Sequence, residues 1–139
     1  MNAQPHLLLL HGFPLDHSLW QPNMEALESV AHVLAPDLLA FETAEEVPAV
    51  LTMEQLADQL KEQLDAQDIQ RTVLCGLSMG GYIAFEVVRQ HANRLSALIL
   101  ADTRAGADTE EGKRGRETNA LLAEKDGPAA VGEAMLPRL

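Results

Sequence analysis

Residues 71–81 read Arg-Thr-Val-Leu-Cys-Gly-Leu-Ser-Met-Gly-Gly, and this stretch decides the fold of the 139-residue chain. The run Arg71–Gly76 is rich in residues typical of strands and ends in glycine, whereas Met79–His91 carries apolar residues at helical spacing. Between them lies a G-x-S-x-G pattern, which is typical of a serine raised on a sharp turn between a strand and a helix. The stretch therefore predicts Ser78 at the carboxyl edge of a sheet.

Outward from this stretch, short apolar runs alternate with helical patterns. Further strands are predicted at His6–Leu10, His32–Ala35 and Leu95–Ala101. Helices are predicted from about Ser18 to Ala31 and after Thr52, where Gln55 completes a capping box, and an acidic loop is predicted at Thr43–Pro48. Strands joined by helical crossovers predict the α/β class, a parallel sheet with helices on both faces.

The alternation stops after Asp102. Residues 105–113 are polar and rich in glycine, and only short helices are predicted beyond them, at Arg116–Lys125 and Ala129–Met135. We therefore expect two regions: residues 1–104, which hold the sheet, and residues 105–139, which add no strand.

Composition restricts the partners. The chain has 10 Lys and Arg against 21 Asp and Glu, a net charge of −11, so its surface repels nucleic acid. The longest apolar run, Leu7–Leu10, is too short to span a membrane, and no signal peptide is recognisable, so we expect a soluble, cytoplasmic protein. No metal-binding or phosphate-binding spacing is present, so no cofactor and no metal are expected. The single cysteine, Cys75, is interpreted as a buried strand residue, with a catalytic cysteine as the alternative.

The glycines around Ser78 indicate nucleophilic chemistry. The turn lifts the hydroxyl above the sheet and places the backbone N–H of Met79, at the start of a helix, beside it. His11-Gly12-Phe13 follows the first strand and is expected next to this turn, so the Phe13 N–H is the second candidate oxyanion donor. His11 is interpreted as a brace for its loop rather than a base. The alternative for Ser78 is an ordinary helix N-cap.

These residues resemble the first half of an α/β-hydrolase. The matching segments, over residues 6–104, are 11–20, 35–38, 76–81 and 98–103. The similarity is to the branch containing 3-oxoadipate enol-lactonase and arylesterases. It implies strands three to six of the usual eight, the start of a helical lid at 105–139, and a small carboxylic ester or lactone substrate attacked by Ser78 to form an acyl-enzyme. Leu39-Ala40 stands where relatives usually have Arg-Gly.

The resemblance also implies a catalytic acid and a histidine after strands seven and eight, which would lie beyond Leu139. Asp102 is a candidate acid or a loop residue, and His17 is interpreted as a surface residue. Two hypotheses follow. The chain is the N-terminal portion of a serine hydrolase, inactive alone for lack of the histidine, or it is a non-catalytic binding or assembly module. Because Leu95–Ala101 would leave an apolar sheet edge open, we expect a C-terminal half or a second copy in a homodimer to cover it.

Overall fold

The computed structural model describes residues 4–38 and 50–138. The predicted loop Thr43–Pro48 and the Leu39-Ala40 pair lie outside the described residues. The chain divides into two compact units, Met1–Ala105 and Gly106–Leu139, which are taken here one at a time.

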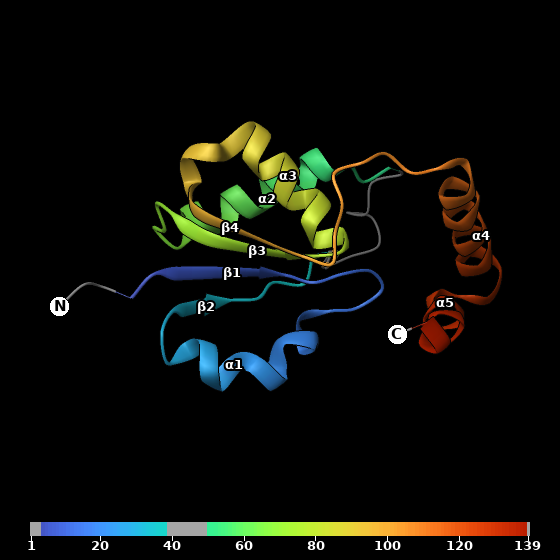
Figure 1. Cartoon of the computed structure of the whole chain (residues 1–139), viewed down its shortest axis with the longest axis horizontal. Coiled ribbons are helices and arrows are strands. Elements are labelled where there is room, and N and C mark those ends of the chain that lie inside the picture. The colour runs from blue at the N-terminus through green and yellow to red at the C-terminus, as the bar shows by residue number, and fades with distance from the viewer. Residues whose placement is uncertain (1–3, 39–49, 139) are drawn as a thin grey trace. The chain divides into compact units, whose positions relative to one another are not determined.

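The first unit is built on a four-stranded parallel sheet in the order β2-β1-β3-β4 (Figure 1). This confirms the α/β class predicted from the sequence. The elements of this unit, in chain order, are β1 His6–Leu10, the 3-10 helix η1 His17–Trp20, α1 Gln21–Glu28, β2 His32–Leu34, α2 Met53–Ala66, β3 Thr72–Leu77, α3 Met79–His91, a 3-10 turn Ala92–Arg94 and β4 Leu95–Ala101.

Helices cover both faces of the sheet, with α1 on one face and α2 and α3 on the other (Figure 1). Alternate residues of a strand point to opposite faces, so the four leucines of β1 divide between two cores. Leu8 and Leu10 pack with buried residues of α2 and α3. Leu7 and Leu9 pack with Cys75 and with Trp20, Met24 and Leu27, from η1 and α1. The central strand β1 is thereby buried on both sides, as strands of parallel sheets are.

The register of the sheet brings two loops together. β1 and β3 are parallel neighbours, and Leu10 at the end of β1 lies opposite Gly76 near the end of β3. The loop that follows β1 and the turn that carries Ser78 therefore leave the sheet side by side, at its carboxyl edge. β4 continues this edge, because Leu77 lies opposite Ala101.

The first helical segment differs from the single helix predicted over residues 18–31. A 3-10 turn begins after Asp16, whose carboxylate accepts a hydrogen bond from the Ser18 N–H, and α1 starts only at Gln21. Pro22 lies in the first turn of α1, where its missing N–H is not needed. The predicted capping box of α2 is present, since Thr52 and Gln55 each bond to the backbone N–H of the other.

The second unit is helical, with α4 Glu110–Asp126, α5 Pro128–Met135 and a 3-10 turn Leu136–Arg138. α4 begins six residues before the predicted Arg116. The reason is its N-cap, because the Thr109 hydroxyl accepts a hydrogen bond from the Gly112 N–H and two glutamates occupy the first turn. Gly127, at φ 85°, separates the two helices. Among the described residues, no helix is both long and apolar enough to cross a membrane.

Candidate active site

Ser78 has a strained backbone conformation at the junction of β3 and α3. Its φ is 51° and its ψ is −109°, a combination that residues with a side chain seldom adopt. Such conformations persist where the surrounding structure enforces them, and they concentrate at functional sites. Ser78 occupies the N-cap position of α3, but its hydroxyl makes no capping hydrogen bond, so it is not an ordinary side-chain N-cap. The turn holds the serine oxygen away from the helix backbone.

Glycines allow the chain to pass through this turn. A Cβ on Gly76 would lie 2.5 Å from the carbonyl oxygen of Gly80, and one on Gly80 would lie 2.5 Å from the carbonyl oxygen of Leu10. Real side chains do not come this close to a backbone oxygen. The first contact brings β3 and α3 together within the turn, and the second seats α3 against the end of β1.

The last residue of β4 and Thr103, which follows the strand, hold the turn from the other side. The Ser78 N–H donates to the carbonyl oxygen of Ala101 at 3.0 Å, and the Thr103 hydroxyl donates to the Ser78 carbonyl at 2.8 Å. The Gly81 N–H donates to the same carbonyl at 3.0 Å. Both polar groups of the Ser78 backbone are therefore bonded, which leaves its side chain as the group available for chemistry.

Of the two predicted oxyanion donors, Met79 adjoins Ser78 in the chain and Phe13 follows Gly12, which lies close to Ser78. Met79 is the first residue of α3, and the first N–H groups of a helix have no partner within it. Phe13 lies in the loop after β1, where a Cβ on Gly12 would be 3.2 Å from the Ser78 Cβ. The turn of that loop is closed by the Leu15 N–H, which donates to the Gly12 carbonyl at 2.9 Å, so it does not use the Phe13 amide.

His11 is buried, and both of its ring nitrogens are engaged. Nε2 accepts a hydrogen bond from the Leu38 N–H at 3.0 Å, so Nδ1 carries the proton and donates to the Gly12 carbonyl at 3.1 Å. Because the Nε2 lone pair is used, the ring cannot take a proton from Ser78 without losing the Leu38 bond. This geometry agrees with the interpretation of His11 as a brace.

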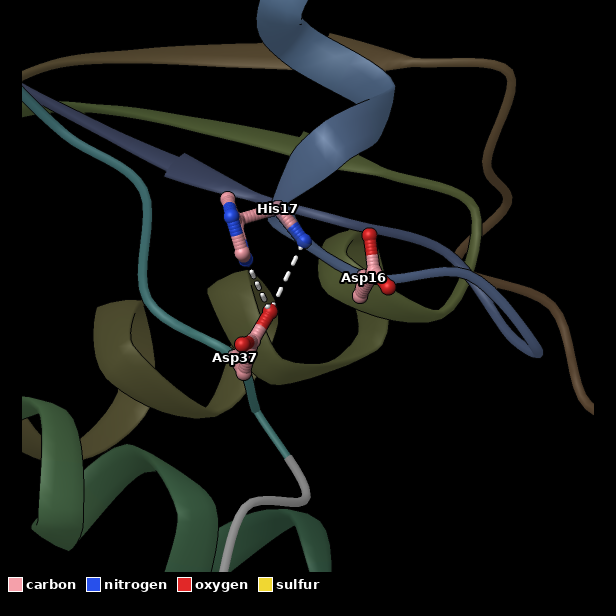
Figure 2. A group of neighbouring side chains, drawn as sticks. All are labelled: Asp16, His17 and Asp37. Carbon is pink, nitrogen blue, oxygen red and sulfur yellow. Dashed lines mark hydrogen bonds and ion pairs between the residues drawn. The ribbon is translucent and has the colours of Figure 1, made fainter.

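His17 joins the loop after β1 to the segment after β2 (Figure 2). Its backbone N–H and its Nδ1 both donate to Oδ1 of Asp37, each at 2.8 Å. The hydrogen bond to Asp37 raises the pKa of His17, and the two bonds from His17 lower the pKa of Asp37. His17 is exposed, as expected, and it links the loop after β1 to the segment after β2.

Asp16, His17 and Asp37 also offer ligand atoms within 4.8 Å of one another, as a metal site would require. However, a proton on His17 Nδ1 blocks that nitrogen as a ligand, and Asp16 is bonded to Ser18. Hydrogen bonds explain the group, and we assign it to loop structure.

The two remaining candidates for a catalytic role are Asp102 and Cys75. Asp102 lies directly after β4, is exposed, and has a positive φ of 41°. Cys75 is buried in β3, and burial raises the pKa of its thiol, which makes it a poor nucleophile and supports the interpretation as a strand residue.

The other three histidines lie away from Ser78. His6 and His32 begin β1 and β2, and their rings are 5.3 Å apart at the opposite edge of the sheet. His91 ends α3, where its Nε2 pairs with Asp58 at 2.8 Å.

Sequence reasoning did not assign a function to Thr103 or to the pair Asp37 and Leu38. Their hydrogen bonds join segments that are 20 to 27 residues apart, and no local pattern marks such pairings. Their positions after strands are the sequence signal that could have identified them, because all of these residues lie at the carboxyl edge of the parallel sheet.

A strained serine between strand and helix, beside a loop that presents a backbone amide, is the arrangement of a nucleophile elbow. The family model for the alpha/beta hydrolase fold matches residues 5–127, and the chain belongs to this family. It is 29% identical over 112 residues to 3-oxoadipate enol-lactonase 1 of Acinetobacter baylyi, an alignment that covers 81% of this chain and 42% of that protein.

Two solved structures are similar over nearly the whole chain. An esterase from Thermogutta terrifontis superimposes with a TM-score of 0.87 at 42% identity, covering 97% of this chain and 50% of that one. The enol-lactonase from Burkholderia xenovorans LB400 superimposes with a TM-score of 0.85 at 30% identity, covering 99% and 52%. The chain therefore spans about half the length of these relatives.

Proposed function

We propose that this chain carries the nucleophile and the oxyanion donors of a serine hydrolase that acts on a small carboxylic ester or lactone. The observation that carries the proposal is the Ser78 turn, whose backbone is strained and fully bonded while its hydroxyl makes no capping hydrogen bond to α3. In the proposed reaction the Ser78 hydroxyl gives its proton to the base while its oxygen attacks the substrate carbonyl. The ester C–O bond breaks and its oxygen takes the proton, which frees an alcohol from an ester and opens the ring of a lactone. Water then attacks the acyl-enzyme, which releases the carboxylic acid and restores the Ser78 hydroxyl.

The negative charge that develops on the carbonyl oxygen is stabilised by the N–H groups of Phe13 and Met79. Backbone donors fixed in advance lose nothing to reorganisation during the reaction, and one such donor accounts for about 10²–10³ in rate. The positive end of the α3 dipole adds to this at the same place.

The general base of the proposed reaction is not one of the five histidines of this chain. His6, His32 and His91 lie away from Ser78, while His11 and His17 are engaged by hydrogen bonds within the loops. We propose that the histidine comes from outside residues 1–139, as the half-length matches to known hydrolases suggest. Its acid partner either comes from outside these residues as well or is Asp102. Asp102 remains the candidate acid within the chain, at the edge that carries Ser78.

The substrate class rests on the relatives, which include an esterase and enol-lactonases. Both groups act on a carboxylic ester bond, linear or cyclic, and the chemistry proposed for Ser78 serves either. In the same proposal residues 105–139 begin the lid, and an additional sheet segment or a second copy covers β4.

Acylation of Ser78 by p-nitrophenyl acetate tests the proposal. The activated ester has a good leaving group, and oxyanion donors alone accelerate acyl transfer by roughly 10³-fold, so labelling does not require the missing base. Peptide mapping by mass spectrometry is expected to find one acetyl group on Ser78 of the wild-type chain.

Two serine variants complete the test. Ser78→Ala is expected to remove the label. Ser29→Ala, which removes a hydroxyl that donates to the Ala26 carbonyl of α1, is expected to be labelled like the wild type. If Ser78 of the wild-type chain acquired no more acetyl label than a serine in a free peptide under the same conditions, the result would contradict the proposal. It would favour the non-catalytic binding module.

A further inference from the structure

We propose that Asp37 and Leu38 form a clamp that positions the loop of residues 11–17, and with it the Phe13 amide, beside Ser78. Asp37 is in this sense a positioning residue, and the inference rests on the proposed function only for the role of Phe13. The two clamp residues follow β2, and they bond to the loop near both of its ends.

The first anchor is the carboxylate of Asp37. A single oxygen, Oδ1, accepts hydrogen bonds from both the backbone N–H and Nδ1 of His17, each at 2.8 Å (Figure 2). One bond fixes the backbone of the loop at His17, and the other fixes the imidazole ring of the same residue. Charge-assisted pairs of this kind are stronger and more directional than neutral ones. The carboxylate therefore holds the carboxyl end of the loop.

The second anchor is the backbone of the next residue. The Leu38 N–H donates to His11 Nε2 at 3.0 Å, and His11 passes the restraint to the Gly12 carbonyl through Nδ1. The Leu38 side chain is itself buried in the core cluster that contains Leu10 and Ile83. The clamp is thus attached to the core of the molecule, so it acts as a fixed support rather than a second mobile loop.

The loop needs such a support because the apolar side chains of its turn are too exposed to fix it. Phe13 is 44% exposed and Leu15 is 37% exposed, so burial of apolar surface does little to hold the turn between the anchors. An oxyanion donor must nevertheless be placed to within a fraction of an ångström, and a displacement of about 1 Å costs about 10²-fold in rate. Hydrogen bonds at both ends of the loop meet this requirement.

Three substitutions of Asp37 separate the position of the acceptor from its charge. Asp37→Ala removes the acceptor. Asp37→Asn keeps an oxygen in the same place without the charge, whereas Asp37→Glu keeps the charge and moves the oxygen by one methylene. The matched control is Asp58→Ala, which breaks another exposed aspartate–histidine pair of the same 2.8 Å length at the far end of α3.

Two readouts are measured on the full chain. Amide hydrogen exchange of Leu15 and Leu38 reports the order of the loop and of the clamp without any need for activity. The second readout is the saturation curve for acylation of Ser78 by p-nitrophenyl acetate, which separates the limiting rate from the concentration at half saturation.

In Asp37→Ala we expect exchange of both amides to accelerate about tenfold. The limiting acylation rate should fall by about ten- to a hundredfold, with little change in the half-saturating concentration. Asp37→Asn should restore both quantities more fully than Asp37→Glu, and Asp58→Ala should resemble the wild type. A merely stabilising role for Asp37 would not produce this order, nor a loss confined to the limiting rate.

The clamp is overturned if exchange in Asp37→Ala and Asp37→Glu matches the wild type. It is also overturned if the loop loosens while acylation keeps its rate, or if Asp37→Glu restores function and Asp37→Asn does not. Should the wild-type chain fail to acylate at all, the proposed function fails, and the exchange measurements alone decide whether the clamp orders the loop.

Discussion

Gly80 carries two requirements at once, because it lies in the first turn of α3 and also against the end of β1. A Cβ at this position would lie 2.5 Å from the Leu10 carbonyl oxygen and 2.7 Å from the Leu10 Cβ. The backbone oxygen cannot move away without disturbing the pairing of β1 with β3. The close approach of α3 to the sheet therefore depends on the absence of a side chain.

Gly80→Ala is accordingly expected to lower the free energy of unfolding by about 1–3 kcal/mol, the usual cost of overpacking. Urea denaturation measures this. Gly115→Ala is the control, since Gly115 lies inside α4 with open space around its Cα, and alanine there should be neutral or stabilise its helix by about 0.5–1 kcal/mol. Equal unfolding free energies for Gly80→Ala and the wild type would show that α3 shifts without cost.

Single residues also mark how far sequence reasoning reaches at the candidate site. The G-x-S-x-G pattern predicted the turn at Ser78, and parallel strand order predicted the loop of Phe13 beside it. The hydrogen bonds of Asp37 and Thr103 could not be predicted, because each depends on how two loops approach across the edge of the sheet. The packing of whole helices and strands determines how such loops approach each other, and the local spacing of residues in the sequence does not indicate it.

At the scale of elements, caps decide where helices begin. α2 begins at a reciprocal pair, in which the Gln55 N–H donates to the Thr52 hydroxyl at 3.2 Å and the Thr52 N–H donates to Gln55 Oε1 at 2.9 Å. α3 and β4 have the bounds predicted for them, since apolar periodicity is strong in both. α4 was predicted too short because its apolar pattern is weak, although Thr109 and the following glutamates did mark its true start.

Thr52→Ala is expected to destabilise the first unit by about 1 kcal/mol, because it leaves N–H groups of α2 without a partner. Thermal unfolding followed by circular dichroism measures the change, and a loss of this size lowers the Tm by about 4–8 °C in a domain of this length. Thr118→Ala provides the comparison, since this exposed threonine lies within α4, where alanine is the better helix former. If both variants melted like the wild type, the capping box would contribute nothing.

At the scale of the whole molecule, the sheet is asymmetric. Among the described strands, β4 lies at one edge and pairs only with β3. Three consecutive apolar side chains of β4 are substantially exposed: Leu98, Ile99 and Leu100. An apolar strand with unpaired backbone groups on one side is a template for pairing with another chain.

The chain is therefore expected to self-associate as its concentration rises, and Ile99→Lys is expected to reduce this association, because a charged side chain on an edge strand opposes pairing. Sedimentation velocity over a range of concentrations measures it. Val30→Lys makes the same chemical change at an exposed site beyond α1 and should leave association unchanged. Equal effects of the two variants would point to net charge, and not β4, as the controlling property.

The bonds that hold Ser78 bear on the order in which the molecule is made. Thr103, which donates to the Ser78 carbonyl, lies 25 positions later in the chain, and Ala101 accepts from the Ser78 N–H. During synthesis the serine leaves the ribosome before either support, and chains fold from the N-terminus as they emerge. A nascent chain thus exposes Ser78 on an unsupported segment, and the bonds that hold its strained backbone form only once β4 has joined the sheet.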